Sequence, residues 1–293
     1  MEMKNILITG GSGFIGKNLK EFLLDKYNLF YPTHRELDLL DTEKVYDFVT
    51  EKKIDIIIHA AVHVPMFNGK DNEYDNDMKM FMNLYSLNDK VEKIIYFGSG
   101  AEYDKRYDIS MVTEDLIGKN MPVSDYGRAK YDMNTIARNS DNVYNLRLFG
   151  IYGKYELWEI KFLSNLICKA LYDLPLTIRM DCYFDFLYID DLSRIVEWFI
   201  ENKPLYHDYN VCYGTQYKLT EFAEMILKTV KKELPIILLS GEKNKDYSAS
   251  NRRLLKEIGN VQIAPIKKSL RDLNEYYKNN LDLIDYNILR NSR

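Results

Sequence analysis

The stretch that decides the fold is residues 4–16, which read KNILITGGSGFIG. A short apolar run leads into three glycines spaced three residues apart, and a helical pattern of apolar residues begins at Leu19. After a strand, Gly10 would allow a sharp turn, Gly13 would let a pyrophosphate approach the backbone, and Gly16 would let the helix pack close to the sheet. Because free N–H groups at the helix start attract such an anion, the stretch predicts a dinucleotide-binding turn. The alternative is an ordinary glycine-rich turn between a strand and a helix.

Composition narrows the class of protein. The chain has 293 residues, of which 46% are hydrophobic, enough for one large domain or two small ones. Its net charge of −4 and the lack of a basic block argue against nucleic acid or an anionic membrane as a partner. No apolar run approaches the roughly 20 residues of a membrane span. The first strand is expected so early that no room is left for a signal peptide.

The cysteines and histidines show no site pattern. Cys168, Cys182 and Cys212 are scattered, without metal-type or redox-type spacing. We therefore expect core thiols in a reducing compartment, the cytoplasm. The four histidines form no metal-ligand pattern either, and we expect no metal site.

Strand patterns alternate with helical patterns along the chain. Strands are expected at 28–31, 54–61, 94–97, 143–148, 184–189 and 209–214. Helices are expected from 42, over about 78–88, 126–136, late in 154–174, and over 192–200, 220–230 and 252–258. Thr42 and Thr220 would cap their helices, Phe81 and Met82 would face the core, and 65–75 would be a loop.

This alternation predicts a doubly wound parallel sheet, the Rossmann type of α/β fold. The cofactor domain would comprise residues 1–152 and parts of 186–214. Residues 153–185 and 215–293 would form a smaller C-terminal α/β domain that binds the substrate. Because ligands bind at the carboxyl ends of parallel strands, the ends of several strands should share one functional edge.

The expected second strand is followed by a cation. An NAD-binding fold usually places a carboxylate there to hold the ribose 2′-hydroxyl, but this chain has His34 and Arg35. A guanidinium suits a 2′-phosphate, so we expect NADPH/NADP as the cofactor. The alternative is a solvated Arg35 paired with its neighbour Glu36.

Ser99, Tyr126 and Lys130 are the candidate catalytic residues. Tyr126 and Lys130 lie four apart on an expected helix and so share one face, and Ser99 follows an expected strand. Beside an ammonium and a nicotinamide ring the phenolate of Tyr126 would be favoured, and its proton could pass to a carbonyl oxygen that Ser99 also binds. Taken alone, the tyrosine and lysine could equally be a half-buried tyrosine beside a solvated lysine.

These features resemble the extended short-chain dehydrogenase/reductase superfamily, in its sugar-nucleotide epimerase/dehydratase branch, over nearly the whole chain. Within that branch the pattern is most similar to the GDP-fucose synthases. The matching segments are 9–16, 60–61, Ser99, Tyr126 with Lys130, 152–153, 186–191 and 209–211. The resemblance implies NADP, a nucleotide-sugar substrate and a homodimer that uses the helices at 78–90 and 126–138.

The resemblance also assigns roles to residues. Tyr126 would donate the proton, Ser99 would bind the carbonyl, and Lys130 would hold the nicotinamide ribose. Cofactor contacts would come from Gly10, Gly13, Phe14, Ile15, Gly16, His34, Arg35, Asp38, Leu39, Ala60, Ala61, Tyr126, Lys130, Leu148, Gly150 and Ile151. Substrate contacts would come from Ala101, Asn165, Lys169 and Arg179.

Departures from the family pattern narrow the reaction. Sugar dehydratases of this branch carry an acid pair where Gly100 and Ala101 stand, and GDP-fucose synthases carry a cysteine at Ala101 and a histidine near Lys161. Since Ala101 cannot move a proton, we expect NADPH-dependent reduction of the 4-keto group of an NDP-4-keto-6-deoxy sugar or heptose, with GDP as the expected nucleotide. Neighbouring carbons would not be epimerised, and the product would serve surface polysaccharide synthesis. The alternatives are an NDP-sugar epimerase, of the 4-epimerase or 3,5-epimerase/reductase type, and a non-catalytic dinucleotide-sensing protein.

Overall fold

Six parallel strands form the central sheet of the computed structural model, which describes residues 3–63 and 72–292. In spatial order the strands are β11 (Asp208–Val211), β6 (Val143–Leu148), β4 (Lys93–Ser99), β3 (Ile56–His59), β1 (Asn5–Thr9) and β2 (Asn28–Phe30). Every residue of β3, β4, β6 and β11 is buried, as expected for a parallel sheet covered on both faces. The predicted doubly wound Rossmann sheet is confirmed.

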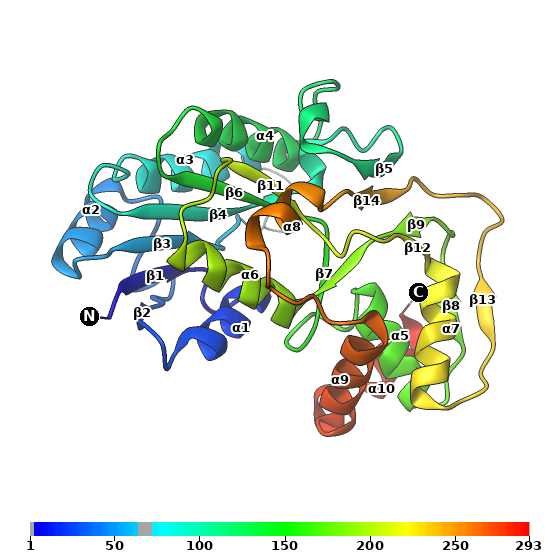
Figure 1. Ribbon diagram of the computed structural model, residues 1–293. Coiled ribbons are helices and arrows are strands. Elements are labelled where there is room, and N and C mark those ends of the chain that lie inside the picture. The colour runs from blue at the N-terminus through cyan, green and yellow to red at the C-terminus, as the bar shows by residue number, and fades with distance from the viewer. Residues whose placement is uncertain (1–2, 64–71, 293) are drawn as a thin grey trace.

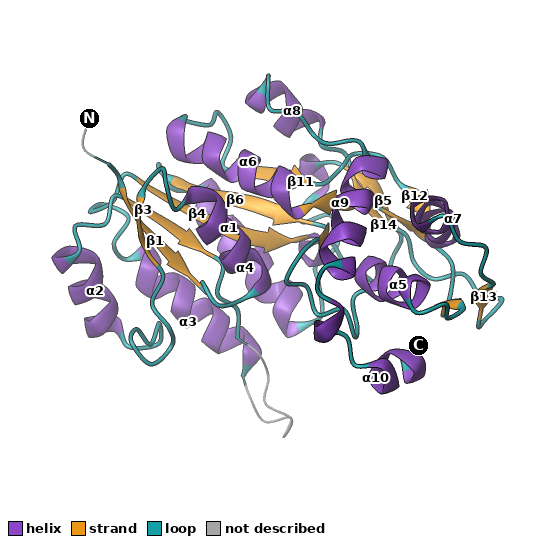
Figure 2. Ribbon diagram, turned by 90° about the horizontal axis from the view of Figure 1, so that it is seen from below, coloured by secondary structure: helices purple, strands orange, loops and turns teal. Residues whose placement is uncertain are grey.

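Helices cover both faces of this sheet (Figures 1 and 2). On one side lie α1 (Phe14–Leu23) and α6 (Ile189–Glu201), and on the other lie α2 (Thr42–Glu51), α3 (Glu73–Tyr85) and α4 (Asp125–Arg138). Alternate residues of a strand face opposite cores. Ile6 and Ile8 of β1 belong to the core under α1 and α6. Leu7 between them belongs to the other core, with Val45 of α2 and Phe81 of α3. The period of two in a strand therefore builds both layers.

The C-terminal part of the chain packs beyond the carboxyl ends of the central strands (Figure 1). Its helices are α5 (Phe162–Leu171), α7 (Leu219–Val230), α8 (Arg252–Ile258), α9 (Ile266–Lys278) and α10 (Tyr286–Asn291). Its largest sheet joins β12 (Tyr217–Lys218), β9 (Tyr183–Phe184), β14 (Tyr247–Ala249) and β5 (Ile109–Val112). The other two sheets pair β10 (Phe186–Tyr188) with β7 (Gly150–Tyr152), and β13 (Ile236–Leu238) with β8 (Leu176–Ile178). Because β5 comes from the first half of the chain, this sheet ties the two parts together.

Two predicted helix caps are wrong. Thr42 is the first residue of α2, and the cap is Asp41, whose carboxylate accepts the N–H of Lys44 at 3.2 Å. Thr220 lies inside α7 and donates its hydroxyl to Asp181 at 2.9 Å. At both helix starts a carboxylate, a stronger acceptor than a hydroxyl, accepts a backbone N–H, which was the role predicted for threonine.

Other predictions about the helices also need correction. Met82 is 40% exposed on α3, whereas Phe81 is buried as predicted. The tail carries α9 and α10 in addition to the predicted helix at Arg252–Ile258. The many lysines and asparagines of these helices make the apolar stripe that α9 buries hard to recognise in the sequence. Most of the loop predicted at 65–75 lies outside the described residues.

Candidate active site

The glycine turn has the geometry that the sequence predicts at its first position. Gly10 follows β1 with φ +69°, and a Cβ there would come within 2.7 Å of the backbone nitrogen of Ala61. Only glycine fits this position without strain. Gly13 precedes α1, and no side chain caps this helix, so its N-terminus faces the carboxyl edge of the sheet uncapped. Gly16 packs against the turn itself, since a Cβ there would lie 2.6 Å from Gly11 Cα, and not against the sheet as predicted.

Beside this turn lies a cavity of about 250 Å³ at the ends of β1 and β3. Five residues predicted to bind the cofactor line it: Gly10, His34, Asp38, Leu39 and Ala61. The backbone of Ala60 stands behind Gly10. A glycine cradle, an uncapped helix start and a cavity next to them fit a dinucleotide. Phe14 and Ile15 lie in the first turn of α1, where their backbone N–H groups are near this edge.

Arg35 lies exposed on the loop after β2, outside the lining of the 250 Å³ cavity. Its alternative partner is engaged elsewhere, because Glu36 accepts the backbone N–H of Thr33 at 2.7 Å and the Thr33 hydroxyl at 2.8 Å. Among residues 3–63 and 72–292, Arg35 forms no ion pair. Within these residues, no carboxylate therefore competes with a cofactor phosphate for the Arg35 guanidinium.

Ser99, Tyr126 and Lys130 converge at the end of β4. Ser99 is the last residue of β4, and its hydroxyl accepts the N–H of Ala101 at 3.1 Å. This hydroxyl is close enough to Tyr126 to influence the pKa of its phenol. Lys130 is only 2% exposed, and its Nζ lies 5.7 Å from the centre of the Tyr126 ring. The three side chains that the sequence singled out are thus neighbours.

The start of α4 explains why they meet. Ser124 caps the helix by accepting the N–H of Gly127 at 3.1 Å. A Cβ on Gly127 would lie 2.6 Å from the carbonyl oxygen of Ala101. The absence of a side chain at Gly127 therefore lets the first turn of α4, and with it Tyr126, approach the residues after Ser99.

Burial sets the protonation of this cluster. It raises the pKa of Tyr126 to about 12, and the nearby hydroxyl of Ser99 only partly opposes the shift. The sequence led us to expect a favoured phenolate beside Lys130; in the protein alone, desolvation outweighs the other effects and keeps the phenol protonated at neutral pH. Burial also lowers the pKa of Lys130, against the attraction of Asp77 and Glu102. A protonated phenol is the state that a proton donor requires.

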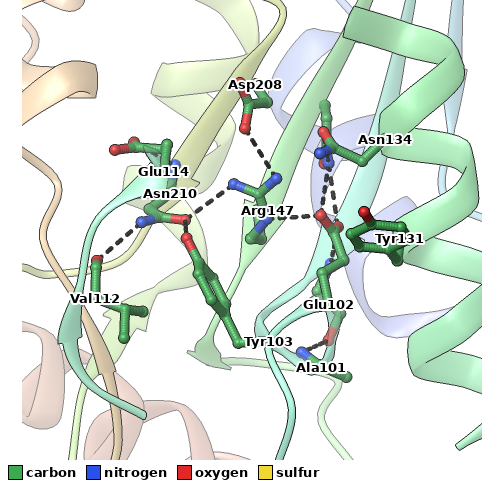
Figure 3. Close-up of polar contacts among 12 residues, drawn as sticks. Ala101, Glu102, Tyr103, Val112, Glu114, Tyr131, Asn134, Arg147, Asp208 and Asn210 are labelled. Atoms are coloured by element: carbon green, nitrogen blue, oxygen red, sulfur yellow. Dashed lines mark hydrogen bonds and ion pairs between the residues drawn. The ribbon is translucent and has the colours of Figure 1, made fainter. Parts of the chain in front are cut away.

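A buried ionic network surrounds Glu102 and Arg147 (Figure 3), and no sequence pattern indicates it. The Glu102 carboxylate accepts the backbone N–H of Ser99 at 3.0 Å, the Nε of Arg147 at 2.7 Å and the amide of Asn145 at 3.1 Å. Glu102 and Arg147 are both fully buried. Arg147 also reaches Asp208 at 2.9 Å. Burial raises the pKa of Glu102, while the guanidinium of Arg147 opposes this shift.

This network joins the two elements that carry catalytic residues. The amide of Asn145 donates to the side chain of Asn134, one turn beyond Lys130 on α4, as well as to Glu102 beside Ser99. Gly98 makes room for it, because a Cβ there would lie 2.8 Å from the amide carbon of Asn145. The network therefore fixes β4 and α4 relative to each other.

A larger cavity of about 510 Å³ opens between the central sheet and the C-terminal part. Three lysines line it, Lys105, Lys161 and Lys245, and none of them forms an ion pair within the described part of the chain. Burial lowers the pKa of Lys105, and the nearby charge of Lys161 adds to this. Its remaining lining is Tyr107, Ile109, Phe149, Gly150, Ile151, Glu156, Phe162, Cys182, Phe184, Phe186, Leu219, Asn244, Asp246 and Tyr247.

None of the four residues predicted to contact the substrate lines this cavity, and two of them have other roles. Asn165 donates to the Ser292 hydroxyl at 2.8 Å, and Lys169 donates to the Ser292 carbonyl at 2.7 Å, so both hold the C-terminal segment. Arg179 is exposed after β8. Ala101 is buried beside Ser99.

Three residues predicted to bind the cofactor lie at this second cavity or behind it. Gly150 and Ile151 line it, and Leu148 is buried at the end of β6, in register with Ser99.

Sequence reasoning missed three ionisable residues of this cavity. Lys105, Glu156 and Tyr247 come from three separate segments and belong to no local motif. Glu156 is 8% exposed and accepts the Ser164 hydroxyl at 2.6 Å. Burial raises its pKa to about 7.

The described residues contain no group of three or more His, Cys, Asp or Glu side chains able to hold a metal ion. Among the same residues, no helix is both long and apolar enough to cross a membrane.

A dinucleotide turn on a doubly wound sheet, with a serine, a tyrosine and a lysine at the strand ends, defines a Rossmann-type oxidoreductase or epimerase. The chain belongs to the NAD dependent epimerase/dehydratase family, whose sequence model matches residues 6–212.

Similar proteins are nucleotide-sugar enzymes at low identity. GDP-6-deoxy-D-talose 4-dehydrogenase of Aggregatibacter actinomycetemcomitans is 26% identical, over 94% of this chain and 98% of that protein. GDP-L-colitose synthase of Yersinia pseudotuberculosis is 27% identical, over 76% of this chain and 81% of that protein. The crystal structure of a GDP-L-fucose synthetase from Naegleria fowleri bound to NADP has the same fold. Its TM-score is 0.82 at 17% identity, over 96% of this chain and 95% of that one.

Proposed function

We propose that this protein uses NADPH to reduce the 4-keto group of a nucleotide-linked 4-keto-6-deoxy sugar or heptose, with GDP as the nucleotide. The observation that carries the proposal is the Ser99, Tyr126 and Lys130 cluster at the sheet edge, with no carboxyl or thiol at Gly100 or Ala101. Such a site can deliver a hydride and a proton but has no acid–base pair next to Ser99 for eliminating water.

The chain's own residues would act as follows. The bound dinucleotide supplies the hydride. Tyr126, protonated at neutral pH, gives its proton to the carbonyl oxygen as the hydride reaches the carbon, so the C=O group becomes a secondary alcohol. Lys130 stabilises the resulting phenolate, which regains a proton from solvent, and Ser99 donates a hydrogen bond to the same oxygen.

Charge supports an anionic substrate. Lys105, Lys161 and Lys245 line the 510 Å³ cavity, together with Glu156 and Asp246, and none of the three lysines forms an ion pair within the described part of the chain. Cations gathered in one cleft favour a polyanion such as a diphosphate. The cavity volume also suits the nucleotide and sugar portions of such a substrate.

Arg35 supports NADPH as the cofactor. Its neighbour Glu36 accepts hydrogen bonds from Thr33, which leaves the Arg35 guanidinium available for a 2′-phosphate. The two relatives add support for GDP, since their names place them on GDP-linked 6-deoxy sugars and colitose. We further propose that the enzyme is cytoplasmic and that its product serves surface polysaccharide synthesis.

We also propose a homodimer that uses α3 and α4. These helices pack side by side on one face of the sheet, and Met82 is 40% exposed on α3. Light scattering of the wild-type protein should give twice the mass of one chain. The Met82→Arg variant should have the mass of a single chain.

One observation favours a second function, reduction combined with epimerisation. Glu156 and Lys161 line the cavity together, and burial raises the pKa of Glu156 to about 7, within the range of an acid–base catalyst. These two residues would then move protons at the carbons that flank the ketone.

A single experiment separates the two functions. NADPH oxidation is followed against a panel of 4-keto nucleotide sugars in heavy water, and the products are analysed by NMR. Turnover without deuterium at the flanking carbons supports the simple reductase. Deuterium at those carbons supports the epimerase/reductase. If Glu156→Gln or Lys161→Gln no longer incorporates deuterium, the replaced residue is the one that moves the proton. The absence of turnover across the panel would overturn both.

A further inference from the structure

A second cavity adjoins the cofactor cavity at the end of β2. It has a volume of about 360 Å³, and its lining includes Lys17 and Lys20 of α1 and Tyr31. Ser12 and Pro32 line both this cavity and the 250 Å³ cavity, so the two meet beside the glycine turn. A substituent of a dinucleotide bound in the 250 Å³ cavity can therefore extend into the 360 Å³ cavity.

Tyr31 holds the ammonium group of Lys20 at this cavity. Tyr31 directly follows β2 and packs against the glycine turn, since a Cβ on Gly11 would lie 2.8 Å from the Cβ of Tyr31. The Nζ of Lys20 lies 4.0 Å from the centre of the Tyr31 ring, and Lys20 is half-buried. Because an aromatic face attracts a cation, this contact keeps the ammonium beside the turn.

The two carboxylates that line the cavity already have hydrogen-bond partners. Glu21 accepts hydrogen bonds from the ammonium of Lys154 and the hydroxyl of Tyr155. Glu36 accepts the backbone N–H and the hydroxyl of Thr33, at 2.7 and 2.8 Å. Neither carboxylate is therefore left to neutralise the lysines of the cavity.

The two ammonium groups of the cavity are the charges that remain unpaired. Within residues 3–63 and 72–292, neither Lys17 nor Lys20 forms an ion pair. The hydroxyl of Ser12, which lines the same cavity, can also donate a hydrogen bond. Unpaired cations and a hydroxyl around one cavity favour an anion with several acceptor oxygens.

The place of the cavity in the fold indicates which anion fits. In a dinucleotide-binding sheet, the 2′-hydroxyl of the adenosine ribose lies at the end of the second strand. Here Tyr31, Pro32 and Thr33 follow β2 and line the cavity. A phosphate on that hydroxyl, like other phosphate monoesters, carries a charge of about −1.5 to −2 at pH 7.

We propose that the 360 Å³ cavity receives the 2′-phosphate of NADPH and that Lys20 is a specificity-determining residue. The ammonium of Lys20 binds this phosphate, so that NADPH binds more tightly than NADH. Arg35, on the loop after Thr33, is then a second cation for the same phosphate. The inference rests on the NADPH dependence proposed above and is independent of the sugar that is reduced.

Lys20→Met tests the inference, because methionine keeps an unbranched side chain over Tyr31 and loses the charge. Fluorescence titration without a sugar substrate measures cofactor binding. The Kd for NADPH should rise about 10-fold, since a charge-assisted hydrogen bond is lost, and the Kd for NADH should not change. Lys20→Arg keeps the charge and should retain most of the affinity for NADPH.

Lys26→Met is the matched control. The Nζ of Lys26 also lies 4.0 Å from the centre of an aromatic ring, that of Phe22, but Lys26 lines neither cavity. This variant should bind NADPH as tightly as the wild-type protein.

Two small ligands separate the 2′-phosphate from the rest of the cofactor. Adenosine 2′,5′-bisphosphate should bind about 10-fold more weakly to Lys20→Met than to the wild-type protein, whereas 5′-AMP should bind equally to both. An equal loss of affinity for NADPH and NADH would contradict the inference, because Lys20 would then support the turn and not the phosphate. An unchanged Kd for NADPH would contradict it as well.

These binding measurements separate the inference from the proposed function. A wild-type protein that binds NADH more tightly than NADPH would refute the proposed cofactor and the inference with it. If the wild-type protein prefers NADPH and Lys20→Met keeps that preference, the role of Lys20 alone is refuted. An inactive wild-type enzyme would refute the proposed reduction and leave the binding result standing.

Discussion

Replacing Glu102 by glutamine should destabilise the protein far more than one neutralised charge usually does. Glu102 is fully buried and receives hydrogen bonds from Ser99, Asn145 and Arg147. Glutamine retains one acceptor oxygen but turns an NH₂ group toward groups that are themselves donors. It also leaves the buried guanidinium of Arg147 with Asp208 as its remaining carboxylate.

The magnitude follows from these contacts. Removing one partner of a buried ion pair costs about 3–5 kcal/mol. Because Arg147 keeps Asp208 at 2.9 Å, we expect the lower end, about 3 kcal/mol. With a slope of about 3 kcal/mol per molar urea for a chain of this size, the unfolding midpoint should fall by about 1 M.

Urea unfolding followed by circular dichroism measures this change. Glu92→Gln is the control, because the pair of Glu92 with Lys4 is exposed and should contribute less than about 0.5 kcal/mol. Combining Glu102→Gln with Arg147→Met should cost less than the sum of the single changes, since the double variant buries no unpaired guanidinium. A midpoint shift below 0.3 M (about 1 kcal/mol) in Glu102→Gln, or strict additivity in the double variant, would refute the reasoning.

Three further predictions concern the cofactor site, the phenol and a buried acid. Tyr126→Phe should lower kcat at least about 100-fold and leave NADPH binding, measured by fluorescence titration, unchanged; surviving turnover would contradict its role. In steady-state assays, Arg35→Ala should raise the KM for NADPH about 10-fold, because a charged hydrogen bond to the 2′-phosphate is lost. The KM for NADH, which has no 2′-phosphate, should not change. Glu156 has a folded pKa of about 7, raised from 4.5, so the unfolded chain binds fewer protons between these values. Its contribution to stability is therefore present below pH 4.5 and is lost as pH rises through 7, a change of about 3 kcal/mol. In Glu156→Gln, urea unfolding at pH 5 and at pH 8 should no longer show the difference in unfolding free energy that Glu156 causes.

What the sequence predicted correctly depends on local rules. The glycine turn at Gly10 requires a positive φ that few residues other than glycine adopt, and Tyr126 and Lys130 are brought together by the period of one helix. Ser99 could be placed beside them because parallel strands end at a common edge. Each of these inferences needs only a few neighbouring residues.

What the sequence did not reveal depends on contacts between distant segments. Arg147 alternates with apolar residues in β6 and shows no sign of being buried until Glu102 and Asp208 are brought to it. The resemblance assigns Lys169 to the substrate, but its ammonium donates to the hydroxyl of Thr177 and the carbonyl of Ser292. A charged residue's role is set by its partners, and those partners are fixed only by the fold.

The position of Ser99 shows why the site needs both parts of the chain. The network behind it, through Glu102 and Asn145, fixes Ser99 relative to α4 and therefore to Tyr126. On its other side lies Tyr247, in a sheet that β5 and β14 build together; a Cβ on Gly100, the residue after Ser99, would come within 2.7 Å of Tyr247 Cζ. Because Tyr247 lies against Gly100, the residue after Ser99, a shift of β14 against the central sheet would alter the surroundings of the Ser99 hydroxyl without moving the cofactor turn. Loosening the pairing of β5 with β14 should therefore slow the chemical step and leave NADPH affinity intact.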